Sequence, residues 1–149
     1  MGKHILLNRT MISIIHPIMG SGITRTLAYL ALCAPYIQGG LAKLFDFQSA
    51  IGEMTHFGLA PATLFAMLVI LLELGASAMI LAGIWRWLVA SALAGFTLLA
   101  TFIALRFWEL PAGQERFMAA NSFFEHIGLV GGLVLVAWLD IQNRGSSNE

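Results

Sequence analysis

Residues 62–84, which read ATLFAMLVILLELGASAMILAGI, decide the fold of this chain. The stretch is apolar throughout except for one charged residue, Glu73. Crossing the hydrocarbon core of a bilayer takes about 20 apolar residues in a helix, because a helix satisfies its own backbone hydrogen bonds in lipid. A helix inside a soluble bundle keeps a polar face, and this stretch has none. The segment therefore predicts a transmembrane helix.

Three further apolar runs have the length of a membrane-spanning helix and lack the alternation of a strand: residues 23–45, 87–107 and 121–138. The composition agrees with membrane embedding. Of the 149 residues, 58% are hydrophobic and 11% charged, whereas about 25% are charged in a typical soluble domain. The sequence predicts an all-α, multi-pass integral membrane four-helix bundle whose first partner is the lipid bilayer.

The domain organisation predicted from these runs has three parts. Residues 1–22 form an N-terminal segment, residues 23–140 the four-helix domain, and residues 141–149 a flexible tail. The short connection at residues 83–87, with its two Trp residues, predicts a tight reversal between the second and third spans. Residues 46–61 suit a short helix on the membrane surface, but a plain polar loop fits them equally well.

The orientation is predicted from the Lys and Arg residues near the spans, which are enriched on the cytoplasmic side. Five lie on the side of the termini, namely Lys3, Arg9, Arg25, Arg86 and Arg144. Three lie on the opposite side, namely Lys43, Arg106 and Arg116. We therefore expect both termini to be cytoplasmic and the protein to lie in the inner (cytoplasmic) membrane.

Glu73 requires an explanation, because a charge near the bilayer centre costs about 2.5–3.5 kcal/mol on insertion scales. It shares a helix face with small residues, including Ala76 and Ser77, which favours an inward direction. The side chain is either a neutral carboxyl that hydrogen-bonds a neighbouring helix or a proton-exchanging group that contacts a ligand. The residues alone leave both interpretations open.

Several polar residues fall in the half of the membrane that faces away from the termini. The spacing of Glu125 with Gly128 and Gly132 predicts that Glu125 points into the bundle, where we expect an ion pair with Lys43. With Trp108, Phe123 and Phe124 as an aromatic rim, this region suits the head group of a quinone, a lipid head group or a protein partner. The candidate ligand-binding residues are Gln38, Lys43, Glu73, Arg106, Asn121, Glu125 and His126.

Other functional classes find no support in the sequence. The scattered basic residues form no stripe for nucleic acid, and the single cysteine, Cys33, lies in an apolar run, which is typical of a buried, inert thiol. The four histidines lack the spacing of metal or haem ligands, and no phosphate loop or nucleophile elbow is present. We expect no metal site and no covalently bound cofactor, and the sequence leaves open whether the chain is an enzyme.

Four motifs, in this order, resemble the DoxX family of bacterial membrane proteins. They are GGLAKL at residues 39–44, FGLAP at 57–61, LELG at 72–75 followed by LAG at 81–83 with Arg86, and NSFFEH at 121–126 with Gly131 and Gly132. The resemblance covers residues 26–138 and implies a four-helix inner-membrane protein. The family takes its name from a terminal quinol oxidase subunit, and some members are linked to redox complexes. The resemblance places Lys43, Glu73 and Arg86 on the family's recurring polar positions.

The polar residues and the resemblance together predict an accessory or quinone-interacting subunit of a membrane redox system. The expected partners are a membrane oxidoreductase and a second copy of the chain. Two alternatives remain at this point. One is a non-enzymatic scaffold or chaperone for a membrane protein, and the other is a small-molecule transporter.

Overall fold

The computed structural model describes residue 17 and residues 20–145, and within these residues it contains helices and no strand. In chain order the elements are α2 (Gly22–Phe45), α3 (Phe47–His56), α4 (Ala62–Ala82), α5 (Arg86–Ala104), the 3₁₀ helix η1 (Phe107–Glu109) and α6 (Gln114–Gly145). The all-α prediction is confirmed. Most of the predicted N-terminal segment, including Lys3 and Arg9, lies outside the described residues, as do residues 146–149 of the predicted tail.

Among the described residues, three helical segments are long and apolar enough to cross a membrane: Ala62–Ala82, Arg86–Glu109 and Gln114–Gly145. The first covers all but the last two residues of the second predicted span, and the other two contain the third and fourth predicted spans. α2 does not meet this combined criterion of length and composition. The 32 residues of α6 extend roughly 48 Å at 1.5 Å per residue, beyond the ~30 Å of a hydrocarbon core. Its polar end turns therefore lengthen the helix well past the predicted span of residues 121–138, and residues 141–145 of the predicted tail are helical.

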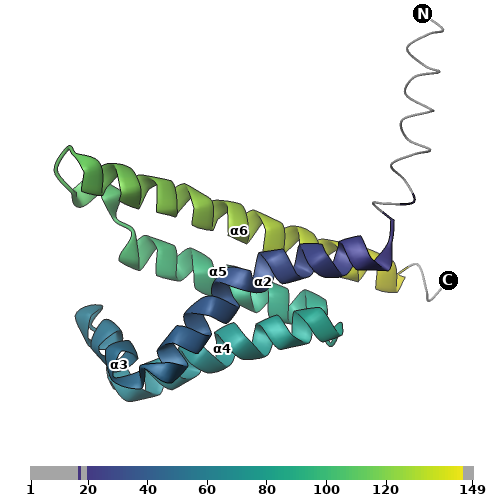
Figure 1. Cartoon of the computed structure of the whole chain (residues 1–149), viewed down its shortest axis with the longest axis horizontal. Helices are drawn as coiled ribbons and strands as arrows, with labels where there is room; N and C mark the ends of the chain where they lie inside the picture. The colour runs from purple at the N-terminus through teal and green to yellow at the C-terminus, as the bar shows by residue number, and fades with distance from the viewer. Residues whose placement is uncertain (1–16, 18–19, 146–149) are drawn as a thin grey trace, which may run out of the picture.

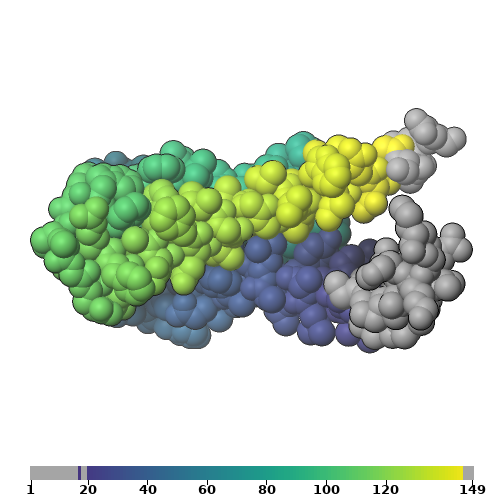
Figure 2. Space-filling model, turned by 90° about the horizontal axis from the view of Figure 1, so that it is seen from above, coloured from purple at the N-terminus to yellow at the C-terminus, as the bar shows by residue number. Residues whose placement is uncertain are grey.

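The helices form two groups that the turn between α4 and α5 connects (Figure 1). The most extensive contacts join α5 to α6 and α2 to α4, and α3 packs on α4. Figure 2 shows α6 along the whole length of one face of the molecule, with α2 beneath it. Because α2 and α6 contact each other only slightly, the two groups are held together mainly by the α4–α5 hairpin and by a small-residue core.

The crossing of α2 and α4 depends on Gly40. A Cβ atom at this position would lie 2.8 Å from Cγ and Cδ2 of Leu74 and 3.3 Å from Cβ of Glu73, so only glycine lets the two helices approach this closely. Pro35 lies inside α2, where its ring and its missing N–H disturb the helix. Figure 1 shows that α2 bends midway, so its first half runs towards α6 and its second half along α4.

The connection between α2 and α4 contains a helix, so the polar-loop alternative for residues 46–61 is wrong. The side chain of Asp46 accepts a hydrogen bond from the backbone N–H of Ser49 at 3.0 Å and caps α3. Ala50 and Met54, four residues apart, are buried against Ala66 of α4. α3 therefore covers one end of α4 with an apolar face.

The predicted reversal between the second and third spans is confirmed. α4 ends at Gly83, which has the left-handed φ of 78° that glycine adopts without strain. The N–H groups of Gly83 and Ile84 donate to the carbonyls of Ile80 and Met79 at 3.3 and 3.0 Å, which satisfies the last turn of the helix. α5 then begins at Arg86 and runs back along α4.

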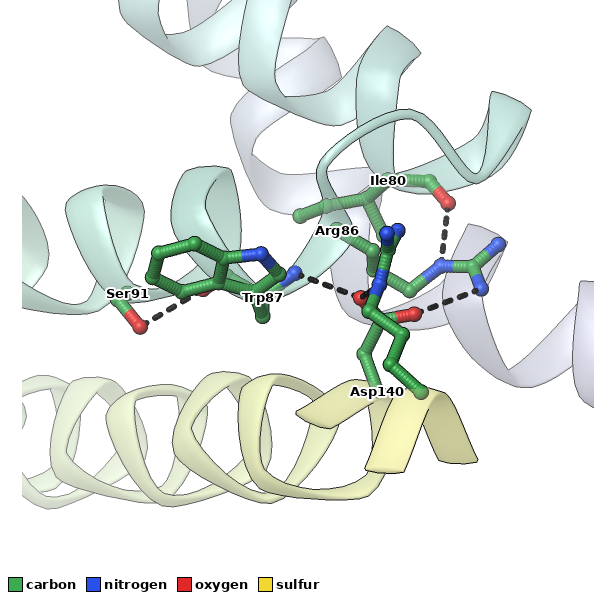
Figure 3. Close-up of polar contacts among 6 residues, drawn as sticks. Ile80, Arg86, Trp87, Ser91 and Asp140 are labelled. Carbon is green, nitrogen blue, oxygen red and sulfur yellow. Dashed lines mark hydrogen bonds and ion pairs between the residues drawn. The ribbon is translucent and has the colours of Figure 1, made fainter. Parts of the chain in front are cut away.

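Arg86 connects this turn to α6, as Figure 3 shows, and also to α2. Its Nε donates to the carbonyl of Ile80 at 2.9 Å, and its Nη1 lies 3.8 Å from Oδ1 of Asp140 on α6. The guanidinium also lies 4.5 Å from the ring centroid of Tyr29 on α2, a cation–π distance. Asp140 in turn accepts hydrogen bonds from the N–H of Trp87 and from Nε of Arg144. These contacts fix α2, α4, α5 and α6 at one end of the molecule.

Gly40→Ala is expected to destabilise the fold by about 1–3 kcal/mol, because the added methyl overpacks the α2–α4 crossing. Gly95→Ala is the matched control, since a Cβ there meets nothing within 4 Å. Unfolding of both variants in mixed micelles, titrated with a denaturing detergent, gives the two free energies. Equal effects at the two positions would show that the crossing does not depend on Gly40.

Arg86→Gln is expected to lower the free energy of unfolding by about 1.5–3 kcal/mol, because it removes a charged hydrogen bond to Ile80 and the ion pair with Asp140, whose side chains are largely shielded from solvent. Arg106→Gln is the comparison. Arg106 pairs with Glu109 at 3.1 Å, but both side chains are about half exposed, so its loss should cost less than about 1 kcal/mol. The same detergent titration separates the two variants, and the reverse order would contradict the role given to Arg86.

Candidate functional site

The candidate site is built around Glu73, in the middle of α4. Glu73 is buried, as are Ala66, Ala76 and Ile80 on the same face of the helix. The predicted inward direction of this side chain is confirmed. The small residues beside it let neighbouring helices approach, so the carboxylate lies between α4 and the last turns of α2.

Lys43 is the ion-pair partner of Glu73. Its Nζ lies 3.4 Å from both Oε1 and Oε2 of the carboxylate, with side-chain exposures of 18% for Lys43 and 9% for Glu73. Lys43 lies in the last turn of α2, where the partial negative charge of the helix terminus also favours a cation. A Cβ at Gly39 would lie 3.6 Å from both Nζ and Oε2, so this glycine packs directly against the pair.

The predicted ion pair between Lys43 and Glu125 is wrong. Glu125 and Gly128 are exposed on the outer side of α6, and a Cβ at Gly128 would meet nothing within 4 Å. Of the glycines on the predicted small-residue face, Gly132 alone lies close to another helix. A Cβ atom at this position would lie 3.0 Å from Cδ1 of Leu32 on α2. α2 packs mainly on α4 and not on α6, which is why Glu73 is the carboxylate that Lys43 reaches.

The structure brings together three of the seven candidate residues. Lys43, Glu73 and His126 line one cavity. Gln38, Asn121 and Glu125 are exposed and do not line it. Arg106 is exposed as well and pairs with Glu109.

The predicted aromatic rim also lies elsewhere. Trp108, Phe123 and Phe124 pack with Phe102 and Phe107 in a cluster whose ring centroids are 5.2–6.4 Å apart. None of these five side chains lines the cavity. The cluster instead ties η1 to α5 and α6, and its edge-to-face contacts are typical of aromatic packing.

The cavity has a volume of about 610 Å³ and lies between the second half of α2, α3 and α4 on one side and α5 and α6 on the other. Most of its wall is apolar, with side chains such as Leu72, Phe96 and Leu129. This volume lies within the range of about 300–1,000 Å³ that is usual for small-molecule sites. The ion pair of Lys43 and Glu73 forms part of the wall, so a charged, polar point faces an apolar space.

Four further polar residues of the wall were not predicted from the sequence, namely Tyr36, Thr97, Thr101 and Glu53. Tyr36 and Thr97 are buried and joined by a hydrogen bond of 2.7 Å, and Thr101 is buried one turn further along α5. The signal that could have found them is helical spacing. Tyr36, Gly40 and Lys43 share a face of α2, and Thr97 and Thr101 continue the face of α5 that carries Ala90 and Ala94. Glu53 of α3, which also lines the cavity, carries no such signal.

A double-mutant cycle tests the ion pair. Lys43→Met or Glu73→Met alone leaves a largely buried charge without its partner, which is expected to cost about 3–5 kcal/mol of stability. The double variant replaces the pair with apolar side chains and should recover most of that loss. Unfolding free energies of the four proteins in the same micelles give the coupling. Losses that simply add in the double variant would contradict the pair.

Comparison with known proteins identifies the family. The sequence model of the DoxX family matches residues 25–106, which contain Lys43, Glu73 and Arg86 and the α2–α5 walls of the cavity. The motif at residues 121–126 and His126 lie beyond the matched range. No curated protein and no solved structure matches the chain. Its apolar helices and this match together indicate a membrane protein, and the chain belongs to the DoxX family.

Proposed function

We propose that this DoxX-family protein is an accessory subunit of a membrane redox system and that its cavity holds the head group of a quinone at Lys43 and Glu73. The single observation that carries the proposal is the mostly buried ion pair in the wall of a cavity of about 610 Å³ that is otherwise largely apolar. An isoprenoid quinone has the matching chemistry, with a polar ring that needs a few directed hydrogen bonds and a tail that stays in lipid.

Four spans in the inner membrane are part of this proposal. The 24 residues of α2 extend roughly 36 Å at 1.5 Å per residue, which suffices to cross a hydrocarbon core beside α4. Figure 1 shows the beginning of α2 and the end of α6 at the same end of the molecule, as an even number of crossings requires. The distribution of Lys and Arg favours the cytoplasmic side for that end.

The geometry of the ion pair leaves room for a ligand. Both Nζ–Oε distances are 3.4 Å, longer than the roughly 2.7–2.9 Å of tight charged hydrogen bonds. A lysine ammonium has three donors, so one remains for an oxygen of the ring. Oxidation of a quinol releases two protons and two electrons. We assign one proton to Glu73 and the other to Glu53, which lines the same cavity, and an oxidoreductase partner would take the two electrons.

Glu73→Gln is expected to lose the quinone that copurifies with the wild-type protein, because it removes the charge partner of Lys43 and the proton acceptor. The measurement is mass spectrometry of lipid extracts from protein purified in mild detergent, with quinone counted per protein. Glu109→Gln makes the same chemical change in the exposed pair with Arg106 and should retain the wild-type amount. Wild-type protein that carries no quinone, and binds none when it is added, would contradict the proposal.

A specific observation favours a second candidate, the scaffold. Asn121, Glu125 and Gly128 are exposed along one face of α6, within the helix that would cross the bilayer. Polar side chains beside a glycine on an outer face are typical of contacts between membrane helices. If scaffolding is the function, Glu125→Gln should release a copurifying membrane protein while Glu73→Gln retains it.

A further inference from the structure

We infer that the cavity selects the reduced, hydroxyl-bearing form of its ring ligand over the oxidised form that carries only carbonyls. The inference rests on the proposed function, because it concerns the same site. It follows from which polar atoms in the wall can still donate a hydrogen bond and which can only accept one.

His126 contributes an acceptor. Its Nδ1 lies 2.6 Å from the carbonyl oxygen of Ser122. Because a carbonyl can only accept, Nδ1 must carry the proton and donate it. In the neutral ring, Nε2 then has a lone pair and no hydrogen. The imidazole, which lines the cavity, therefore offers a ligand an acceptor.

Tyr36 contributes a second acceptor. Thr97 has one hydroxyl hydrogen, and its Oγ1 lies 2.7 Å from the carbonyl oxygen of Leu93, to which it donates. The hydrogen bond of 2.7 Å between Tyr36 and Thr97 must then be donated by the tyrosine. The phenolic hydrogen of Tyr36 is thus used within the protein, and its oxygen can only accept from a ligand.

The remaining polar groups follow the same pattern. The hydroxyl of Thr101 donates to the carbonyl of Thr97 at 2.6 Å, so only the lone pairs of the hydroxyl oxygen remain for a ligand. Glu53 and Glu73, when ionised, are acceptors only. With His126 neutral and both carboxyl groups ionised, Lys43 is the one described side chain of the wall that retains a donor for a ligand. The wall therefore combines one donor with several acceptors.

The two forms of a quinone ring meet this wall differently. A quinone presents two carbonyl oxygens, which can accept from Lys43 but face lone pairs at the other polar groups. A quinol presents two hydroxyl groups, each of which donates one hydrogen bond and still accepts. One hydroxyl oxygen can accept from Lys43 while the hydroxyl hydrogens donate to such acceptors as Nε2 of His126 and the oxygen of Tyr36. Because buried polar groups without partners weaken binding, the reduced form is favoured.

The test compares three probes that share one substituted ring and one tail, on the full chain in mild detergent without oxygen: decylubiquinol, decylubiquinone and the dimethyl ether of the quinol. Isothermal titration calorimetry gives their dissociation constants. We expect the quinol to bind at least tenfold more tightly than the quinone. This ratio would raise the two-electron midpoint potential of the bound couple by about 30 mV. The ether, which has no donors, should bind as weakly as the quinone.

Variants test whether the hydrogen-bond acceptors of the wall cause the preference for quinol over quinone. Tyr36→Phe and His126→Phe each remove one acceptor and keep an aromatic ring, so each should lower the quinol-to-quinone affinity ratio by several fold, while Glu109→Gln should leave it unchanged. Equal affinities, tighter quinone binding, or an unchanged ratio in both variants would overturn the inference and leave the proposed site intact. Failure of the wild-type protein to bind any of the probes would overturn both.

Discussion

The close approach of α2 and α4 at Gly40 is the constraint on which the rest of the structure depends. The helices are so close at this point that a Cβ atom would not fit between them. This approach brings the last turn of α2 beside the middle of α4. Lys43 then reaches the carboxylate of Glu73. Without this approach, each charge would need another partner inside a largely apolar bundle, at a cost of several kcal/mol.

The same crossing shapes the cavity. Because α2 bends and its second half follows α4, it diverges from α6 and contacts that helix only slightly. The space between the two helix groups is closed at one end by the contacts of Arg86 with α4, α2 and α6. Away from that end, the ion pair and several further polar side chains, among them Tyr36 and Thr101, interrupt an otherwise apolar wall. The packing that stabilises the fold thus also defines what the cavity can bind.

Properties of single helices could be predicted from the sequence. The apolar run at 62–84 became α4 at Ala62–Ala82, and its small residues correctly indicated that Glu73 points inward. Residues 46–61 suited a short helix and a polar loop equally well, and α3 formed within them at Phe47–His56. The length of α6 was underestimated, because polar residues such as Glu115 end an apolar run without ending a helix.

Relations between helices were not predictable in the same way. Spacing along α6 puts Glu125 and Gly132 on related faces, but it does not say which helix that face meets, and the pairing of Lys43 with Glu125 failed for this reason. Tyr36 and Thr97 are ordinary residues on their own helices and become a polar pair only because α2 and α5 meet. The recurring family positions Lys43 and Glu73 were known from the resemblance, but their contact was not.

In the proposed function, a quinone head group occupies the cavity at Lys43 and Glu73. Its most direct test is cross-linking with a photoreactive short-chain quinone, followed by peptide mass spectrometry of the labelled chain. If the head group binds in the cavity, label is expected on residues of the cavity wall such as Leu72, Phe96 and Leu129. That label should be lost when unmodified quinone is added in excess. Label confined to the outer face of α6, at exposed residues such as Val134 and Leu135, would contradict it.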